Sequence, residues 1–328
     1  MLILTERCNL RCSYCYARAG ERGADMTPET AFLALERLGA GAGGLTVELT
    51  GGEPLLNFGL VRELVSAGGA PGRRFALQTN GLALDRAKLS FLLERGVGLG
   101  LSLDGPPGVN QLTRGGGPAG FAALRLLDEL GAGVNLTVVL TRQNIEHLPR
   151  FLLTLAGFRC PRVVNLDLVR PVGRARGQGL APAPRQVREM VPRLLSALEF
   201  IAARRFPPLK VREVDQVRRR AGLGAVEPYC LAAAGSYAAV TPGGEVYPCA
   251  SLVGRPQYLA GRLEQDKPLE LAPLVADWGL PGPCRDCPVR FVCRGGCPSR
   301  RISAGGGPGA PYDLECLLRR EIYARMMK

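Results

Sequence analysis

The chain of 328 residues lacks any apolar run long enough to span a membrane, and it also lacks a secretory signal. A transmembrane helix needs roughly 18 or more consecutive apolar residues, and none is found. Met1 is followed directly by the apolar residues 2–4 and by Thr5, without the basic, apolar and small-residue regions of a signal peptide. The sequence therefore predicts a cytoplasmic protein that does not bind a membrane.

Histidine is nearly absent, since His147 is the only one, and it lies at the start of a predicted helix. This position favours a surface role over catalysis. A recognisable nucleic-acid-binding module is also missing, although the net charge is +13. Because the arginines are spread along helical patterns and loops, we predict general basicity and no nucleic-acid partner. Thiolate-bound metal clusters and an anionic substrate would each offset part of this charge.

Cysteine, by contrast, is abundant, with 11 residues. A cytosolic chain of this size neither keeps nor needs disulfides, so metal binding is the expected use of these thiols. Three cysteines lie between Cys8 and Cys15, seven lie between Cys230 and Cys316, and only Cys160 stands between the two groups. The spacing predicts two separate metal-binding regions.

Short apolar segments alternate with amphipathic ones over the first 206 residues, which predicts strands alternating with helices. Six strands separated by helices imply an α/β fold with a parallel sheet. The predicted strands cover residues 2–4, 45–49, 74–78, 98–103, 135–140 and 163–169, and the predicted helices cover residues 28–38, 58–67, 85–95, 120–130, 145–155 and 184–205.

The composition shifts towards Gly, Pro and Cys after a basic stretch at residues 218–220. We therefore predict three parts: a parallel βα domain at residues 1–206, a linker at 207–225 and a small cysteine-rich domain at 226–328. Within the last part, short strands are expected at 237–241 and 245–247, and a helix at 314–327.

Cys8, Cys12 and Cys15 have the spacing C-x3-C-x2-C and directly follow the first predicted strand. A [4Fe–4S] cluster normally takes four thiolates, so these three would leave one iron open to an exogenous ligand. An open coordination position is what a catalytic metal centre requires. The alternative readings are a zinc site and chance clustering.

The run CNLRCSYC at residues 8–15 resembles the signature of the radical S-adenosylmethionine (SAM) superfamily. In that family SAM chelates the open iron, and reduction by the cluster yields a 5′-deoxyadenosyl radical that abstracts hydrogen from the substrate. The resemblance implies a partial (β/α)6 TIM-like barrel and a flavodoxin- or ferredoxin-type reductant. It also implies that Cys8, Cys12 and Cys15 are the ligands of the catalytic cluster.

The segment TGGEP at residues 50–54 follows the second strand and resembles the GGEP motif that binds the SAM amino group. Its glycines would let the backbone approach a ligand closely. Polar residues also end the third and fourth strands, where parallel barrels build their sites. By resemblance, the residues that contact SAM are Tyr14, Gly51, Gly52, Glu53, Pro54, Asn80, Ser102 and Asp104. Purely structural roles, in loop packing, helix capping and strand capping, fit Tyr14, Glu53, Ser102 and Asp104 as well.

Seven cysteines in the last third of the chain are spaced closely, with glycine and proline between them. Such segments can fold around metal without a large apolar core, and a zinc ribbon is the alternative reading. The pattern resembles the SPASM extension of radical SAM enzymes. By that resemblance, one auxiliary [4Fe–4S] cluster is held by Cys284, Cys287, Cys293 and Cys316, and another is held by Cys230, Cys249 and Cys297.

The second of these ligand sets lacks a fourth cysteine, because residues 215–229 contain none where some relatives supply one. We therefore expect an open iron in this cluster, which Cys160, a substrate thiol or water would fill. A carboxylate ligand from Asp or Glu is the rival interpretation.

The resemblance is strongest to enzymes that modify a peptide or protein substrate, and a crosslink such as a thioether is the favoured product. Sulfatase maturation is less favoured, because Ala250 follows Cys249 where that subfamily has an aspartate. Haem-precursor modification is a further alternative, since arginines at residues 171–176 would suit a carboxylate-rich tetrapyrrole. A fourth interpretation is a protein that is not an enzyme, either an electron carrier or a zinc-binding adaptor. Because Met1 directly precedes the first strand, we expect no N-terminal peptide-recognition domain.

Overall fold

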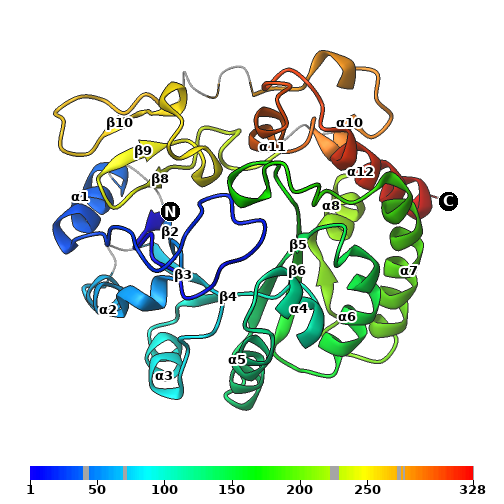
Figure 1. Cartoon of the computed structure of the whole chain (residues 1–328), viewed down its shortest axis with the longest axis horizontal. Helices are drawn as coiled ribbons and strands as arrows, with labels where there is room; N and C mark the ends of the chain where they lie inside the picture. The colour runs from blue at the N-terminus through cyan, green and yellow to red at the C-terminus, as the bar shows by residue number, and fades with distance from the viewer. Residues whose placement is uncertain (40–43, 69–71, 222–228, 272–274, 276–277, 328) are drawn as a thin grey trace.

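The computed structural model describes residues 1–39, 44–68, 72–221, 229–271, 275 and 278–327 (Figure 1). Its described strands join in one ten-stranded sheet with the order β10-β9-β8-β1-β2-β3-β4-β5-β6-β7. These strands are β1 (Leu2–Ile3), β2 (Leu45–Thr50), β3 (Arg73–Thr79), β4 (Gly98–Ser102), β5 (Val134–Leu140), β6 (Pro161–Leu168), β7 (Lys210–Val211), β8 (Ala239–Val240), β9 (Glu245–Tyr247) and β10 (Gly261–Arg262).

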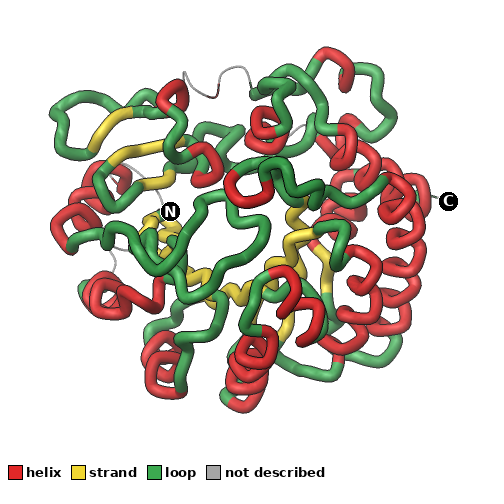
Figure 2. The backbone as a smooth tube through the Cα atoms, viewed as in Figure 1, coloured by secondary structure: helices red, strands yellow, loops and turns green. Residues whose placement is uncertain are grey.

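Helices alternate with the parallel strands and surround the curved sheet, as Figures 1 and 2 show. The described α-helices are α1 (Pro28–Gly39), α2 (Phe58–Ser66), α3 (Arg86–Glu94), α4 (Pro107–Thr113), α5 (Gly117–Glu129), α6 (Leu148–Ala156), α7 (Pro184–Ala202), α8 (Arg212–Arg220), α10 (Arg290–Cys293), α11 (Pro298–Ser303) and α12 (Asp313–Met326). Short 3-10 helices are η1 (Pro54–Asn57), η2 (Ile145–His147), η3 (Gly173–Ala175), η4 (Ala250–Leu252), η5 (Pro256–Tyr258) and η6 (Gly282–Cys284). No helix in these ranges is both long and apolar enough to cross a bilayer.

Leucines on neighbouring strands form the centre of the core. Leu49 of β2 is paired with Leu77 of β3, and Leu101 of β4 is paired with Leu136 of β5. All four side chains are buried. These buried apolar residues recur in each strand, which is why the strands were recognisable from the sequence. The six predicted parallel strands and their helices are present, so the predicted α/β architecture is confirmed.

The segment predicted as a linker, residues 207–225, has a regular structure within its described part. Strand β7 pairs in parallel with β6, and helix α8 packs against β6. The linker prediction is therefore wrong for residues 210–220, which extend the parallel sheet. These elements were not predicted because their periodic pattern is weak: β7 has only two residues, and α8 ends in three consecutive arginines. The predicted boundary near residue 225 lies outside the described residues.

The C-terminal part touches both ends of the parallel sheet. Strand β8 pairs in parallel with β1, while β8, β9 and β10 form an antiparallel meander. Near the other end, helix α12 packs against α7 and α8. This part has a small apolar cluster of its own, formed by Ala232, Leu252, Val275, Trp278 and Ile302. The C-terminal part therefore joins the two edges of the open barrel.

Candidate functional site

The long loop between β1 and α1, residues 4–27, carries the first three cysteines and is held by backbone hydrogen bonds. The Cys8 amide donates to the carbonyl of Gly20 at 2.6 Å, and the Ser13 amide donates to the carbonyl of Thr113 at 3.0 Å. The Arg174 amide, in the loop after β6, donates to the carbonyl of Cys15 at 3.0 Å. This loop, which we call the cysteine loop, is thus fixed to the end of helix α4 and to the loop after β6.

Gly51 and Gly52 lie against the backbone of the cysteine loop. The Gly52 amide donates to the carbonyl of Thr5 at 2.8 Å, and the next amide donates to the carbonyl of Arg7 at 2.9 Å. A Cβ on Gly52 would overlap the Arg7 carbonyl oxygen and come within 3.0 Å of the Cβ of Cys8. Only glycine fits here, because another backbone occupies the space of a side chain.

Glu53 is completely buried and ties the glycine turn to the end of β3. Its carboxylate accepts hydrogen bonds from the Thr79 hydroxyl at 2.7 Å, the Asn80 amide at 2.8 Å and the Leu55 amide at 3.1 Å. Burial raises the pKa of Glu53, and the three hydrogen bonds oppose this shift. These contacts match the structural role considered for Glu53, which caps η1.

The carboxyl ends of the parallel strands surround an inner cavity of about 370 Å³. Most of the predicted cofactor-binding residues line it together with the three cysteines. The residues brought together are Cys8, Cys12, Cys15, Tyr14, Gly51, Gly52, Asn80 and Ser102. Glu53, Pro54 and Asp104, which were also predicted to contact the cofactor, lie outside this lining.

Asp104 lies behind the wall of the inner cavity, where it supports two residues that do line it. It accepts a short hydrogen bond from the Tyr14 hydroxyl, and its other oxygen is 3.1 Å from Nε of Arg114. The Arg114 guanidinium lies 5.5 Å from the centre of the Tyr14 ring, in a cation–π arrangement. Asp104, Tyr14 and Arg114 are all buried. Asp104 is therefore a positioning residue, and Arg114 is a site residue that no motif in the sequence had indicated.

The thiols of the cysteine loop lie in a poorly solvated environment. Burial raises the pKa of Cys12 to about 11, with the nearby Arg114 charge opposing the shift. Burial also raises the pKa of Cys8, whose sulfur accepts a hydrogen bond from the Leu10 amide at 3.4 Å. The Asn80 side chain lies 3.8 Å from the same sulfur. Metal binding would therefore release protons from these thiols, because a thiolate is the ligand.

Four C-terminal cysteines surround a second, separate cavity of about 280 Å³. This space is much larger than a single ion, since zinc held by four thiolates is in direct contact with all of them. The Arg320 guanidinium lies 3.7 Å from the sulfur of Cys287 and places a positive charge beside the thiols. The four cysteines are Cys284, Cys287, Cys293 and Cys316.

The remaining cysteines of the C-terminal part lie nearer the inner cavity. Cys249 lines that cavity, and the sulfur of Cys297 is 3.2 Å from the Ser299 hydroxyl and 3.9 Å from the Arg170 guanidinium. Burial raises the pKa of Cys230, and the neighbouring Cys297 and Cys249 thiols add to that effect. Cys230, Cys249 and Cys297 therefore form one group at the edge of the inner cavity.

A chain of buried and partly buried charges connects this group to the barrel. Asp167, at the end of β6, forms ion pairs with Arg170 at 2.8 Å and with Arg300 of α11. Arg300 continues to Glu315 of α12 at 2.7 Å, and Arg319 lies 3.9 Å from the same carboxylate. The Arg170 and Arg300 charges lower the pKa of Asp167, although burial alone would raise it. We call these five residues the charge chain.

Cys160 and His147 lie away from these groups. Cys160 directly precedes β6 and contacts the carbonyl of Leu124 at 3.6 Å, at the end of the strand opposite to the cavity. At roughly 3.3 Å per strand residue, the length of β6 separates Cys160 from the site by about 25 Å. The interpretation of Cys160 as a ligand of the C-terminal group is therefore wrong. His147 is exposed, which agrees with its predicted surface role.

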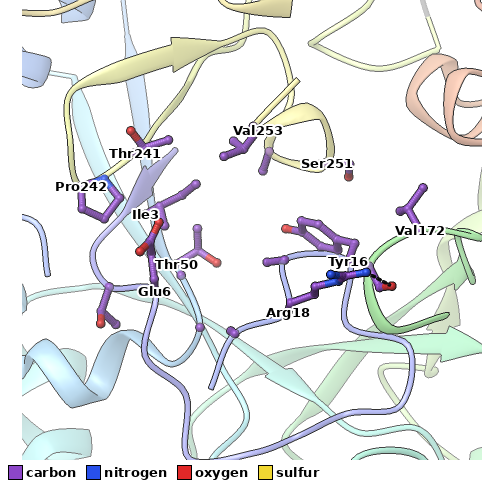
Figure 3. Close-up of a pocket in the computed structure, with 18 of the residues that line it drawn as sticks. Ile3, Glu6, Tyr16, Arg18, Thr50, Val172, Thr241, Pro242, Ser251 and Val253 are labelled. Carbon is purple, nitrogen blue, oxygen red and sulfur yellow. Dashed lines mark hydrogen bonds between the residues drawn. The ribbon is translucent and has the colours of Figure 1, made fainter. Parts of the chain in front are cut away.

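An outer cavity of about 560 Å³ adjoins the inner one and shares Tyr16, Gly51, Gly52 and Ser251 with it. Figure 3 shows Tyr16 and Arg18 on one side, Thr241 and Pro242 on the opposite side, and Val172 from the loop after β6. Its walls come from the cysteine loop, the loop after β6 and the C-terminal part. The two cavities are thus neighbours that share part of their lining.

Comparisons with known proteins agree with this arrangement. A family model described as the radical SAM superfamily matches residues 2–155. Mycofactocin maturase MftC of Mycobacterium tuberculosis is 30% identical over 336 residues, which cover 96% of this chain and 81% of that protein. The structure of anSMEcpe with bound AdoMet and the Cp18Cys peptide has a TM-score of 0.80 at 21% identity, covering 100% of this chain and 96% of that one. The fold is therefore shared along the whole chain.

Archaeal proteins are similar over a shorter part of the chain. Fe-coproporphyrin III synthase of Methanosarcina barkeri is 34% identical over 172 residues, which are 51% of this chain and 43% of that protein. The chain spans only 42 to 62% of the length of the three archaeal relatives that match about half of it.

Proposed function

Because the chain belongs to the radical SAM superfamily, we propose that it is an enzyme that oxidatively modifies a side chain of a peptide or protein. The favoured product is a crosslink such as a thioether. Peptide-directed relatives support this substrate class: mycofactocin maturase matches nearly the whole chain, and the similar fold of anSMEcpe holds a peptide. A [4Fe–4S] cluster and SAM are the cofactors that the superfamily implies.

The observation that carries the proposal is the lining of the inner cavity. Three thiols, a glycine turn and two polar strand ends face one space of about 370 Å³, which is within the usual range for a small-molecule site. We propose that Cys8, Cys12 and Cys15 hold the catalytic cluster. Tyr14, Gly51, Gly52, Asn80 and Ser102 would contact SAM. When bound, the cluster and SAM supply the 5′-deoxyadenosyl radical that abstracts hydrogen from the substrate.

Two auxiliary clusters are also part of the proposal. The cavity of about 280 Å³ with four cysteines fits a four-thiolate [4Fe–4S] cluster. Cys230, Cys249 and Cys297 would hold the other beside the inner cavity, where an electron acceptor is close to the modified substrate. A flavodoxin- or ferredoxin-type protein would supply electrons. A reducing cytosol is the proposed location, because these thiols must stay free of disulfides.

We propose that the auxiliary cluster near the inner cavity has an open iron. Cys160 is too distant to fill it, and the two carboxylates closest to Cys297 in the charge chain already have partners. Asp167 pairs with two arginines, and Glu315 accepts hydrogen bonds from the Tyr229 hydroxyl at 2.8 Å and the Cys297 amide at 3.0 Å. Once these two carboxylates of the described residues are set aside, we propose a substrate thiol or water as the fourth ligand.

The proposal is tested first by SAM cleavage, which needs no substrate. Anaerobically reconstituted, reduced protein should form 5′-deoxyadenosine, and Cys12→Ala should abolish it. Cys160→Ala is the matched control, since that thiol lies far from the cavity, and it should keep full activity. If the protein with its full iron content failed to bind SAM, the proposal would be wrong.

The type of modification is tested with candidate peptides. A crosslink lowers the peptide mass by one pair of hydrogen atoms, which mass spectrometry resolves, and fragmentation locates the joined residues. Cys230→Ala, with the other clusters intact, should stop product formation while SAM still binds. Product formation by this variant would show that the auxiliary site near the cavity has no part in the reaction.

Haem-precursor modification is a second candidate, supported by the archaeal relative named Fe-coproporphyrin III synthase and by Arg174 and Arg176 near the cavities. Formation of an iron coproporphyrin from an iron tetrapyrrole precursor by the reduced enzyme, with no peptide product, would favour it. Sulfatase maturation has less support, because Ala250 lines both cavities where that subfamily has an acid. Superfamily membership excludes the electron carrier and the zinc-binding adaptor.

A further inference from the structure

The outer cavity has a strong excess of positive charge. Four arginines and a single carboxylate, Glu6, contribute to its lining. Within the described ranges, none of these arginines forms an ion pair with a carboxylate of the chain, although fifteen such pairs occur elsewhere. The charge of the lining is therefore positive, and Glu6 is the one carboxylate in it that offsets part of that charge. The four arginines are Arg18, Arg22, Arg176 and Arg255.

These arginines come from three separate segments that converge on one opening. The cysteine loop contributes Arg18 and Arg22, the loop after β6 contributes Arg176, and the C-terminal part contributes Arg255 just before η5. Because the four arginines come from separate segments, we expect one small anion to contact only part of the set. Several carboxylates along a chain would reach all of it.

The backbone that carries Arg18 is fixed in an unusual conformation. Arg18 has a φ of 54°, in the left-handed region that residues other than glycine rarely adopt. Its guanidinium donates to the carbonyl of Gly173 at 3.3 Å, as the dashed line in Figure 3 marks. A Cβ on Gly173 would overlap the Cys15 carbonyl oxygen, so the two loops are in close contact. Such local strain is typical of functional sites, where the surrounding structure maintains it.

On the basis of the proposed function, we propose that the outer cavity binds an acidic segment of the peptide substrate. Arginine suits this role, because its planar guanidinium donates two parallel hydrogen bonds to a carboxylate. Tyr16 and Ser251, which line both cavities, mark the passage from the bound acidic segment to the inner cavity. The acidic residues would flank the modified residue and place it near the catalytic thiols.

The test measures binding to the anaerobically reconstituted protein with SAM present. The probes are a short fluorescein-labelled peptide rich in glutamate, the same peptide with every glutamate replaced by glutamine, and coproporphyrin III. We expect the glutamate peptide to bind at least about tenfold more tightly than the glutamine peptide, and the difference to shrink as salt is added. Equal binding of the two peptides by protein that cleaves SAM would overturn this inference while leaving the proposed function intact.

Matched variants locate the binding. Arg176→Gln combined with Arg255→Gln should weaken glutamate-peptide binding by about tenfold. The control combines Arg125→Gln and Arg150→Gln, which remove the same charge from exposed positions on α5 and α6, and it should change binding by less than about twofold. If both double variants lost the same affinity for the glutamate peptide, only general charge attraction would be acting, and the outer cavity would not be the binding site. Tighter binding of coproporphyrin III than of the peptide, lost in the first variant alone, would overturn the peptide as occupant.

Discussion

Gly52 shows how one missing side chain controls the position of the three thiols of the cysteine loop. We predict that Gly52→Ala displaces the cysteine loop, because the new Cβ would overlap the Arg7 carbonyl oxygen and crowd Cys8. The reconstituted variant should contain about four fewer iron atoms per chain and bind SAM weakly. Iron and sulfide analysis measures the first effect, and equilibrium dialysis measures the second.

Gly59 provides the control for that variant. A Cβ at this position in α2 would meet no atom within 4 Å, so Gly59→Ala should keep the full iron content. It should also stabilise the fold by about 0.5–1 kcal/mol, because alanine favours helix. Normal iron content in Gly52→Ala would contradict the proposed contact between the glycine turn and the cysteine loop.

Asp104 is predicted to act through its neighbours. Asp104→Asn leaves the buried Arg114 guanidinium without its carboxylate, which should cost about 3 kcal/mol of unfolding free energy. SAM affinity should also fall, because Tyr14 and Arg114 lose the group that orients them. Urea unfolding gives the stability, and Asp85→Asn is the matched control, since asparagine caps a helix as well as aspartate. An unchanged stability of the Asp104 variant would argue against the ion pair.

At the scale of single residues, the sequence predicted the thiols and the glycines but not their supports. The motif spacing placed Cys8, Cys12 and Cys15 on one loop, and the structure brings them to one cavity. Arg114 was missed because its pairing with Asp104 joins two segments that no short motif connects. Asp104 itself was predicted at the cofactor, since a polar strand end does not reveal whether the side chain points to the cavity or behind it.

Helix α11 is joined to the barrel and to α12 through Arg300. We predict that Arg300→Met loosens these elements, because Asp167 and Glu315 each lose a buried partner. The loss should be about 3 kcal/mol, and hydrogen exchange should increase in residues 297–319. Arg325→Met removes a partly exposed ion pair of α12 and should change stability by less than about 0.5–1 kcal/mol. If both variants exchanged equally, the charge chain would have no special role.

At the scale of elements, predictability followed the strength of the periodic pattern. Strands β2 to β6 are five to eight residues long and each contains buried apolar residues, and each was predicted. Strand β7 and helix α8 were interpreted as a linker. The two residues of β7 are too few to show an alternating apolar pattern, and α8 ends in a run of arginines. Helix α4 was missed as well, since its sequence PGVNQLT begins with proline and glycine and has little apolar character. Its position depends on tertiary contact with α5.

The whole molecule has a large apolar core that fills the barrel and includes residues of β8, β9 and α12, and a small separate core in the C-terminal part. We predict that removing iron with a chelator under anaerobic conditions unfolds the C-terminal part first, because cluster ligation replaces core burial there. Hydrogen exchange should rise in residues 229–271 and 278–327, while β2 to β6 stay protected. Untreated protein in the same buffer is the control. A uniform rise along the chain would contradict a C-terminal part that is held by its clusters.

The C-terminal part also provides one wall of each cavity, including Cys249 of the inner one and Arg255 of the outer one. If the folding of the C-terminal part depends on iron, a newly made chain has neither cavity complete until its clusters are inserted. Substrate capture would then come after maturation in time, so a chain still waiting for iron would not sequester the peptide. Under iron shortage the proposed peptide substrate would then stay free, because it would not bind to chains without clusters.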